Sequence, residues 1–147
     1  MLQRSRLDFL RRHLKKPMKN TYKLKYQCAE TVESVSKMIK EQGDASWKLW
    51  LFEFVDAFRR QTDFALIETP PVADVSLRMR CLLDATTEAL CAEKNITSPQ
   101  WCRELRVLPE PWFLSECENL KAMALVESPV YFRKRNIFVL NNFLRRA

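Results

Sequence analysis

The sequence predicts a mainly α-helical protein, a single compact domain of five to seven helices with room for one short two-stranded pairing. Two observations carry this prediction. The 147 residues include one glycine, Gly43, whereas β-rich folds need many turns with positive φ. Apolar residues make up 47% of the chain, and in several segments they recur with helical spacing. A chain of this length can bury one substantial core.

The clearest helical pattern begins at Trp47. Large apolar side chains follow one another at i, i+3, i+4, i+7, i+8 and i+11, namely Trp47, Trp50, Leu51, Phe54, Val55 and Phe58. We expect this face to anchor the core, because helical spacing favours core packing over an aromatic ligand-binding box. Leu49 and Phe52 lie off the face, which indicates that the helix is covered on a second side.

Other helices are predicted on both sides of this one. Residues 28–42 form a helix that ends at Gly43, with Val32, Val35, Met38 and Ile39 inward. Asp44 is the expected cap of the next helix, and Asp74 of a long helix reaching about Lys94. The inward side chains of that long helix are expected to be Leu77, Cys81, Leu82, Ala85, Ala89 and Leu90. Thr97-Ser98-Pro99 begins a helical turn.

The last third of the chain combines stiff turns with aromatic side chains. Two prolines flank Glu110 and hold the backbone extended before Trp112. Ser115 and Glu118 fit a capping box for a helix to about Val126, with Leu120, Met123 and Ala124 on its inner face.

Ser128 should cap a short helix that stops near Asn136. Ile137–Leu140 is apolar and branched and is expected to be a strand, for which Phe64–Ile67 is the candidate partner. The side chains expected to anchor the structure are all aromatic: Trp47, Trp50, Phe54, Trp101, Trp112, Phe113, Phe132 and Phe138.

The net charge of +7 is unevenly distributed along the chain. Residues 1–30 hold nine Lys/Arg against two acidic residues, residues 31–127 hold 11 against 16, and residues 128–147 hold five against none. We therefore divide the chain into a basic N-terminal segment, residues 1–27, and one helical domain, residues 28–147.

Two basic clusters are the candidates for binding a partner or an anion. The first lies in residues 2–16, around Leu7, Leu10 and Leu14, and comprises Arg4, Arg11, Arg12, Lys15 and Lys16. This segment fits a loosely docked terminal helix, an arm that binds a polyanion such as nucleic acid, or a membrane-surface helix.

The second cluster is Arg133, Lys134 and Arg135. Three adjacent cations cannot all be buried, so at least two should face water or an anionic partner. Ordinary surface charge that caps helix carbonyls is the alternative interpretation.

Catalytic chemistry is not expected from these residue types. The single glycine excludes glycine-rich phosphate loops, and five cysteines with one histidine, His13, form neither a disulfide framework nor a zinc site, so we expect buried reduced thiols. Asp84 and Glu88 lie one helical turn apart and are expected on a solvated acidic face. We expect no catalytic residue, cofactor or metal, and the absence of a long apolar run or signal stretch suggests a cytoplasmic protein without membrane attachment.

From about Asp44 onward, the chain resembles the helical domain found C-terminal to helix-turn-helix modules in bacterial antitoxin-like regulators. The resemblance covers about two thirds of the chain and is carried by these motifs: Glu53–Arg60, Pro70-Pro71, Leu83–Leu90, Pro99-Gln100-Trp101, Pro109–Phe113, Ser128–Val139 and Leu144–Ala147. The motif at 128–139 is the most specific. Residues 1–43 are too short for a helix-turn-helix module and lack its turn, so the resemblance does not extend to one.

The resemblance implies a non-enzymatic protein that binds a partner protein, such as a cognate toxin. A regulator that binds nucleic acid through its basic ends is the alternative function. An enzyme is a third hypothesis, which the residue content disfavours. The oligomeric state and the identity of the partner do not follow from the sequence.

Overall fold

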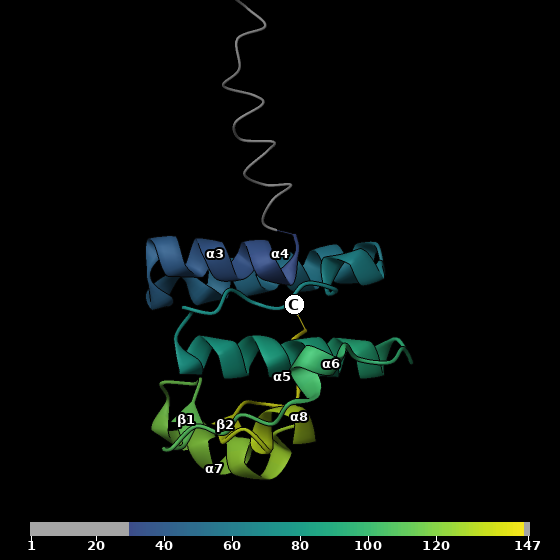
Figure 1. Cartoon of the computed structure of the whole chain (residues 1–147). Coiled ribbons are helices and arrows are strands. Elements are labelled where there is room, and N and C mark those ends of the chain that lie inside the picture. Colours follow the sequence, from purple (N-terminus) through teal and green to yellow (C-terminus); the bar gives the residue numbers. More distant parts are fainter. Residues whose placement is uncertain (1–29, 146–147) are drawn as a thin grey trace, which may run out of the picture.

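The structure is a computed structural model that describes residues 30–145, and it confirms the mainly helical fold class (Figure 1). Within this range six α-helices are present: α3 (Val32–Gln42), α4 (Trp47–Arg60), α5 (Leu77–Glu93), α6 (Gln100–Arg103), α7 (Glu118–Glu127) and α8 (Val130–Arg133). Two 3-10 helices, η1 (Asp44–Ser46) and η2 (Phe64–Leu66), and two strands, β1 (Trp112–Phe113) and β2 (Ile137–Phe138), complete the described elements.

The helices are stacked in layers. In Figure 1, α3 and α4 lie together at the top, α5 crosses the middle, and α7, α8 and the two strands lie below it. α5 packs against α4 on one side and against α6 and α8 on others. This central position, which the sequence does not reveal, decides which polar side chains become buried.

A capping box and a glycine define the two ends of α3, whereas the predicted cap of α4 is not formed. Thr31 and Ser34 form a reciprocal capping box at the start of α3, in which each hydroxyl accepts the other residue's backbone N–H at 3.1 Å. Gly43 ends α3 with φ of 91°, a conformation that favours glycine. Asp44 lies inside η1 instead of capping α4, so that prediction is wrong; its carboxylate accepts the hydroxyl of Ser76 at 2.7 Å.

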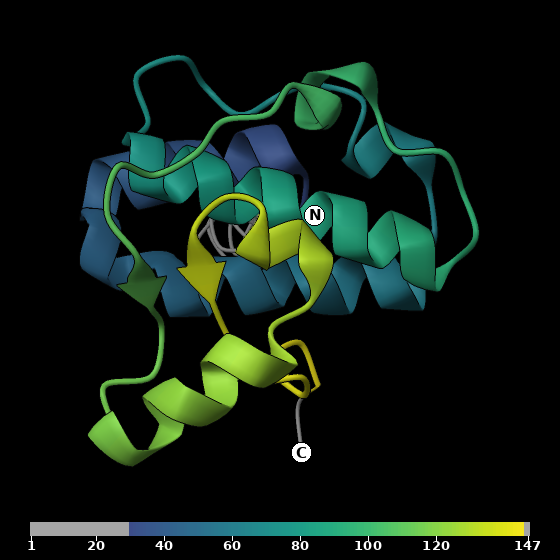
Figure 2. The same ribbon diagram turned by 90° about the horizontal axis from the view of Figure 1, so that it is seen from below.

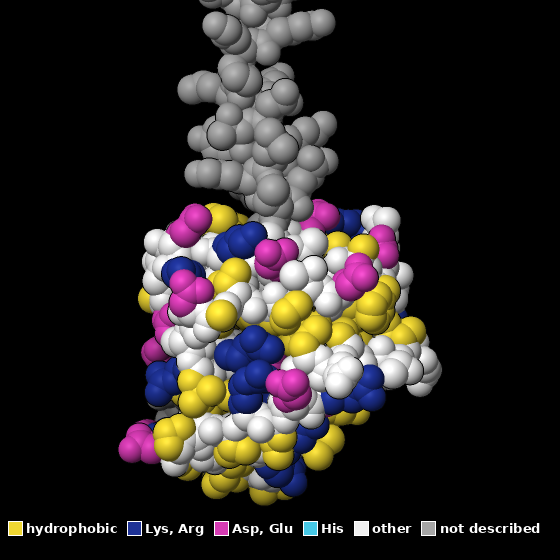
Figure 3. All heavy atoms as spheres, in the orientation of Figure 1, with side chains coloured by type: hydrophobic (Ala, Val, Ile, Leu, Met, Phe, Trp, Pro, Cys, Tyr) yellow, Lys and Arg dark blue, Asp and Glu magenta, His cyan; other side chains and the backbone are white. Residues whose placement is uncertain are grey.

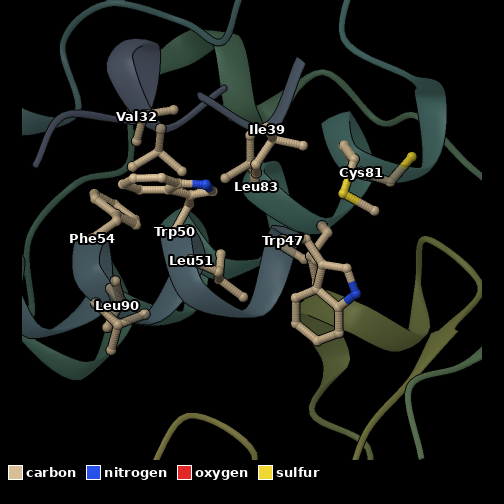
Figure 4. Close-up of a cluster of buried hydrophobic side chains, with 14 of the residues drawn as sticks. Val32, Ile39, Trp47, Trp50, Leu51, Phe54, Cys81, Leu83 and Leu90 are labelled. Carbon is tan, nitrogen blue, oxygen red and sulfur yellow. The ribbon is translucent and has the colours of Figure 1, made fainter. Parts of the chain in front are cut away.

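The predicted stripe of α4 forms the core, as expected from its spacing. All six of its side chains are buried, and Figure 4 shows Trp50, Leu51 and Phe54 directed to an interior shared with α3 and α5. Burial of each such side chain contributes roughly 1.5–3 kcal/mol. α4 is therefore the main apolar anchor of the fold.

α5 differs from its prediction at both the cap and the inner face. Ser76, not Asp74, caps the helix by accepting the N–H of Met79 at 3.3 Å, and Leu77 is exposed. Residues 81–88 are buried all around the helix because neighbouring elements cover it on several sides. Asn95, with φ of 55°, turns the chain out of the helix.

The strand at Ile137 has a different partner from the predicted one. β2 pairs in parallel with β1, with Trp112 opposite Ile137 and Phe113 opposite Phe138, whereas Phe64–Leu66 forms η2. The N–H of Trp112 donates to the carbonyl of Asn136 at 2.9 Å. The extended backbone after the prolines at 109 and 111 makes this pairing available.

The two serine caps expected in the last third are also wrong. The hydroxyl of Ser115 accepts the N–H of Cys117, and α7 begins two residues later than predicted, at Glu118, without a side-chain cap. Ser128 is buried, and its hydroxyl donates to the carbonyl of Ile137 and accepts the N–H of Val139. Ser128 therefore ties the end of α7 to β2. α8 ends at Arg133, earlier than predicted, and a turn follows it; Asn136, with φ of 65°, ends that turn in the left-handed conformation expected of it.

The eight predicted aromatic anchors fall into two groups. Trp47, Trp50, Phe54 and Phe132 are buried, whereas Trp101, Trp112, Phe113 and Phe138 are half-buried. The half-buried rings bridge elements: Trp112 meets Trp47 edge-on at 6.1 Å, and Phe113 stacks on Phe138 at 5.1 Å. The indole N–H of Trp101 donates to the carbonyl of Ile67 at 2.9 Å.

Candidate protein-interaction surface

The basic cluster at residues 133–135 is divided between surface and interior. Arg135 is fully buried, and its guanidinium donates to Glu88 at 2.7 Å and to the carbonyls of Tyr131 and Cys102. Arg135 is therefore not available to a partner at the surface. Lys134 and Arg133 are exposed, which confirms the prediction that at least two of the three cations face water.

Both exposed cations already have partners within the fold. Lys134 pairs with Glu88 at 2.8 Å, and Arg133 donates to the carbonyls of Val126 and Ser128 at the end of α7. Arg133 thus neutralises the negative end of that helix. The cluster serves mainly to hold α8 and α7 in place.

The prediction that Asp84 and Glu88 form a solvated acidic face is wrong. Asp84 is fully buried beside Arg80 at 2.9 Å and Arg106 at 3.4 Å. Glu88 is 8% exposed and pairs with Lys134 and Arg135. We name these two carboxylates and their four cationic partners the α5 ion cluster. Charges buried in this way need such partners.

Burial raises the pKa of Asp84 above its ordinary value near 3.8, although the adjacent Arg80 and Arg106 pull it down. The folded state therefore binds a proton more readily than the unfolded state. A carboxyl with a raised folded pKa gains stability as pH falls through that pKa, and loses it as pH rises.

We expect the wild type to gain stability relative to Asp84→Asn as pH falls from 7 to about 4. The gain should be on the order of 1 kcal/mol for each unit by which the pKa is raised. Urea unfolding of both proteins across this pH range measures the difference. A constant difference, or one with the opposite slope, would contradict the assigned direction.

Three of the four described cysteines are poor nucleophiles because they are buried. Cys81, Cys91 and Cys102 are buried free thiols, as predicted, whereas Cys117 is exposed, so the prediction is wrong for that residue. Burial raises the pKa of Cys91 to about 11 and that of Cys102 to about 12, so both stay protonated at neutral pH. Among residues 30–145, no three His, Cys, Asp or Glu side chains are arranged to hold a metal ion.

An open cavity of about 200 Å³ lies between α4 and the C-terminal segment. We name it the α4 cavity; its walls are Trp47, Lys48, Phe52, Leu114, Ser115, Val139, Leu140, Asn142 and Phe143. Leu49, three residues before Phe52 on α4, is 53% exposed. These are the two off-stripe residues of the sequence pattern. Phe143 covers Phe52 at 5.7 Å, so the second side of α4 is partly covered.

Phe143 is the residue that sequence reasoning missed. Its ring contacts Trp47, Phe52 and Phe132 at 5.7–6.1 Å. It also lines a second cavity of about 250 Å³, which borders the Arg59–Glu93 ion pair and Pro129. Phe143 and Leu144 stand between two asparagines and an arginine, and this short apolar pair has no helical or strand periodicity that would predict a buried ring.

The outer side of α7 is apolar. Met123, Leu125 and Val126 are 47%, 50% and 78% exposed, and Val130 just beyond the helix is 61% exposed. Ala124 is the buried residue of this helix, so the predicted inward position of Met123 is wrong. In Figure 2, α7 projects away from α4 and α5, and in Figure 3 hydrophobic side chains gather at the lower edge, where α7 lies in Figure 1.

The N-terminal candidates, Arg4, Arg11, Arg12, Lys15 and Lys16, lie outside the described residues. Residues 30–145 contain 15 Lys/Arg and 17 Asp/Glu, so the positive excess of the chain resides almost entirely in residues 1–29. The described part of the chain is thus close to electrically neutral.

None of the described helices is long and apolar enough to cross a bilayer; the longest, α5, has 17 residues. No family model, curated protein or solved structure matches this chain.

Proposed function

We propose that the protein is a non-enzymatic interaction protein that acts by binding a partner protein, with the α4 cavity as its docking site. The observation that carries this proposal is an open cavity with mainly apolar and aromatic walls at the molecular surface. Its volume of about 200 Å³ is below the ~300–1,000 Å³ usual for small-molecule sites. It suits one or two apolar side chains of a protein partner.

The surroundings of the cavity favour a helical partner. Leu49 extends the apolar surface along α4 beyond the cavity, and Lys48 borders it. An amphipathic helix recognises such a surface by placing side chains at i, i+3 or i+4 into it. Phe143 covers part of the second side of α4, and the partner helix would cover the rest of that side.

We further propose that this role is antitoxin-like and that the partner is a cognate toxin. The support is the resemblance carried by the motifs from Glu53 to Ala147. Its most specific motif, residues 128–139, forms α8 and β2 and contributes Val139 to the cavity wall. The motif therefore supplies part of the wall of the proposed docking site.

Nucleic-acid binding through residues 1–29 is the second candidate, favoured by nine Lys/Arg against a single acidic residue there. Such binding loses affinity steeply as salt rises, because displaced counterions drive it. Binding at a largely apolar interface is expected to depend less steeply on salt. A titration between 50 and 200 mM salt, in the range where about 10³-fold losses occur for nucleic acid, separates the two.

The protein encoded beside this chain is the partner to test, by co-purification and titration with the full chain. Leu49→Glu should weaken the complex about tenfold or more, because it places a charge on the apolar docking surface. Phe64→Glu is the matched control, since Phe64 is 50% exposed beyond the other end of α4 and should leave binding unchanged. Equal binding by wild type and Leu49→Glu would reject the α4 cavity as the docking site, and absence of any complex would reject this partner.

A further inference from the structure

The side of α4 that faces away from the core combines apolar and acidic side chains. Leu49 is 53% exposed, and Phe52, Glu53 and Asp56, at i+3, i+4 and i+7 from it, are each partly exposed. These spacings place the four residues on the side of the helix opposite its buried stripe, and we name them the α4 outer face. Phe52 also belongs to the wall of the α4 cavity, so the face and the cavity adjoin.

The cations of α4 stand at the two ends of the helix and already have partners. Lys48 lies over the indole ring of its neighbour, 5.6 Å from the ring centroid. Arg59 and Arg60 form ion pairs with acidic residues elsewhere in the chain, at 2.8 and 3.2 Å. Between these ends the charged residues are Glu53 and Asp56. A segment complementary to the α4 outer face is therefore both apolar and basic.

The described chain begins beside this helix. Glu30 pairs with Arg60 at 3.2 Å, at the C-terminal end of α4 (Figure 1). Fully extended, residues 17–29 span about 43 Å. Leu49 lies only about 17 Å along the helix from Arg60. Residues ahead of position 17 can therefore reach the whole α4 outer face, whereas α7 lies on the far side of α5 in Figure 1.

We propose that the basic segment at residues 2–16, which lies outside the described residues, docks on the α4 outer face of the same chain. Its sequence supplies an apolar stripe at i, i+3 and i+7, formed by Leu7, Leu10 and Leu14. These leucines cover Leu49 and Phe52, and the arginines and lysines that flank them meet the two carboxylates of the face.

Charge and tethering favour this occupant over a second copy of the α4 outer face. Two copies packed face to face would bring carboxylates together, and like charges suppress association. Residues 1–29 instead hold nine Lys/Arg against one acidic residue. A tether of this length also gives the segment an effective concentration on the order of 1 mM, which a free second copy does not have.

The docked segment competes with the partner protein, because Phe52 and Leu49 belong to the surface that the partner is proposed to use. This consequence rests on the proposed function. With an effective concentration of about 1 mM and an intrinsic dissociation constant of about 0.1 mM, the segment is docked in roughly nine chains of ten. Its release should therefore raise the affinity for the partner about tenfold.

The docking is tested without any partner, by amide NMR spectra of the full chain. The triple variant Leu7→Ser, Leu10→Ser, Leu14→Ser removes the apolar stripe and should release the segment. Within the described range, the largest shifts should then fall at residues 49–56, while the amides of α7 keep their positions. Unchanged signals from α5 show that the variant is folded.

A charge reversal on α4 gives the reciprocal measurement. Glu53→Lys should shift the amide signals of residues 7–14, which lie far from position 53 in the sequence. Glu41→Lys is the matched control, because it makes the same change of charge at an exposed residue of α3 opposite the buried side of that helix. The control should leave the signals of residues 7–14 in place.

Several results would overturn the proposal: no shift at residues 49–56 in the serine variant, shifts centred on α7, or equal effects of Glu53→Lys and Glu41→Lys. Shifts that depend on protein concentration would assign the contact to a second copy and overturn docking within one chain. Reciprocal shifts without any partner complex would support the docking and leave the proposed function rejected. A complex that Leu49→Glu weakens, without reciprocal shifts, would support the proposed function and reject the docking.

Discussion

Replacing Arg135 with alanine is expected to lower the free energy of unfolding by about 3–5 kcal/mol. The change leaves Glu88, which is 8% exposed, with Lys134 as its remaining ion-pair partner. It also removes the donors to the carbonyls of Tyr131 and Cys102. A buried carboxylate and a buried carbonyl without their partners each cost free energy. Urea unfolding followed by circular dichroism measures the loss.

Arg133→Ala is the matched control two residues away. Its side chain is exposed and donates to two carbonyls at the end of α7, so we expect a loss of about 0.5–1.5 kcal/mol. Equal effects at 133 and 135 would contradict the structural division of the basic cluster.

Removal of both buried partners should cost less than removal of one. In the double variant Glu88→Gln with Arg135→Met, no buried unpaired charge remains, because Lys134, which also loses Glu88, is exposed to water. Replacements of this kind are often close to neutral. A double-mutant cycle with the two single variants should give a coupling free energy of about 0.5–3 kcal/mol. A coupling near zero would show that the pair does not act as a unit.

Phe54→Ala is expected to lower the free energy of unfolding by about 3–5 kcal/mol. Phe54 is fully buried in the stripe of α4, and its ring lies 6.2 Å from that of Phe58. Truncation removes the transfer free energy of the ring and leaves a cavity between helices that are held by other contacts. The midpoint of urea unfolding should fall while the slope stays the same.

Leu49→Ala tests the same helix on its exposed side. Because Leu49 is 53% exposed, the change should alter stability by no more than about 0.5 kcal/mol. A large loss at Leu49 would mean that this side chain supports the fold and is not a free docking surface. A small loss at Phe54 would contradict the assignment of α4 as the core anchor.

The proposed sites could be predicted from the sequence only in part. Leu49 and Phe52, off the stripe of α4, predict a second covered side; Phe52 lines the α4 cavity, whereas Leu49, three residues earlier, is exposed beside it. The opposite side of that cavity comes from Phe143, which is 91 residues later than Phe52 and has no local pattern. The spacing of α7 predicts an inward Met123, whereas the structure exposes it, because apolar residues occur on both sides of this helix and spacing alone does not select one side.

What the sequence determined by itself is local: helix periodicity in α4, the stop at Gly43, and the left-handed turn at Asn136. These depend on backbone conformation and on neighbours within one or two helical turns, which the chain specifies residue by residue. Two features were decided only by the tertiary structure: the burial of the Asp84 and Glu88 carboxylates, and the pairing of β1 with β2. Whether a carboxylate is solvated depends on which elements cover its helix, and a two-residue strand takes whichever partner the packing brings beside it.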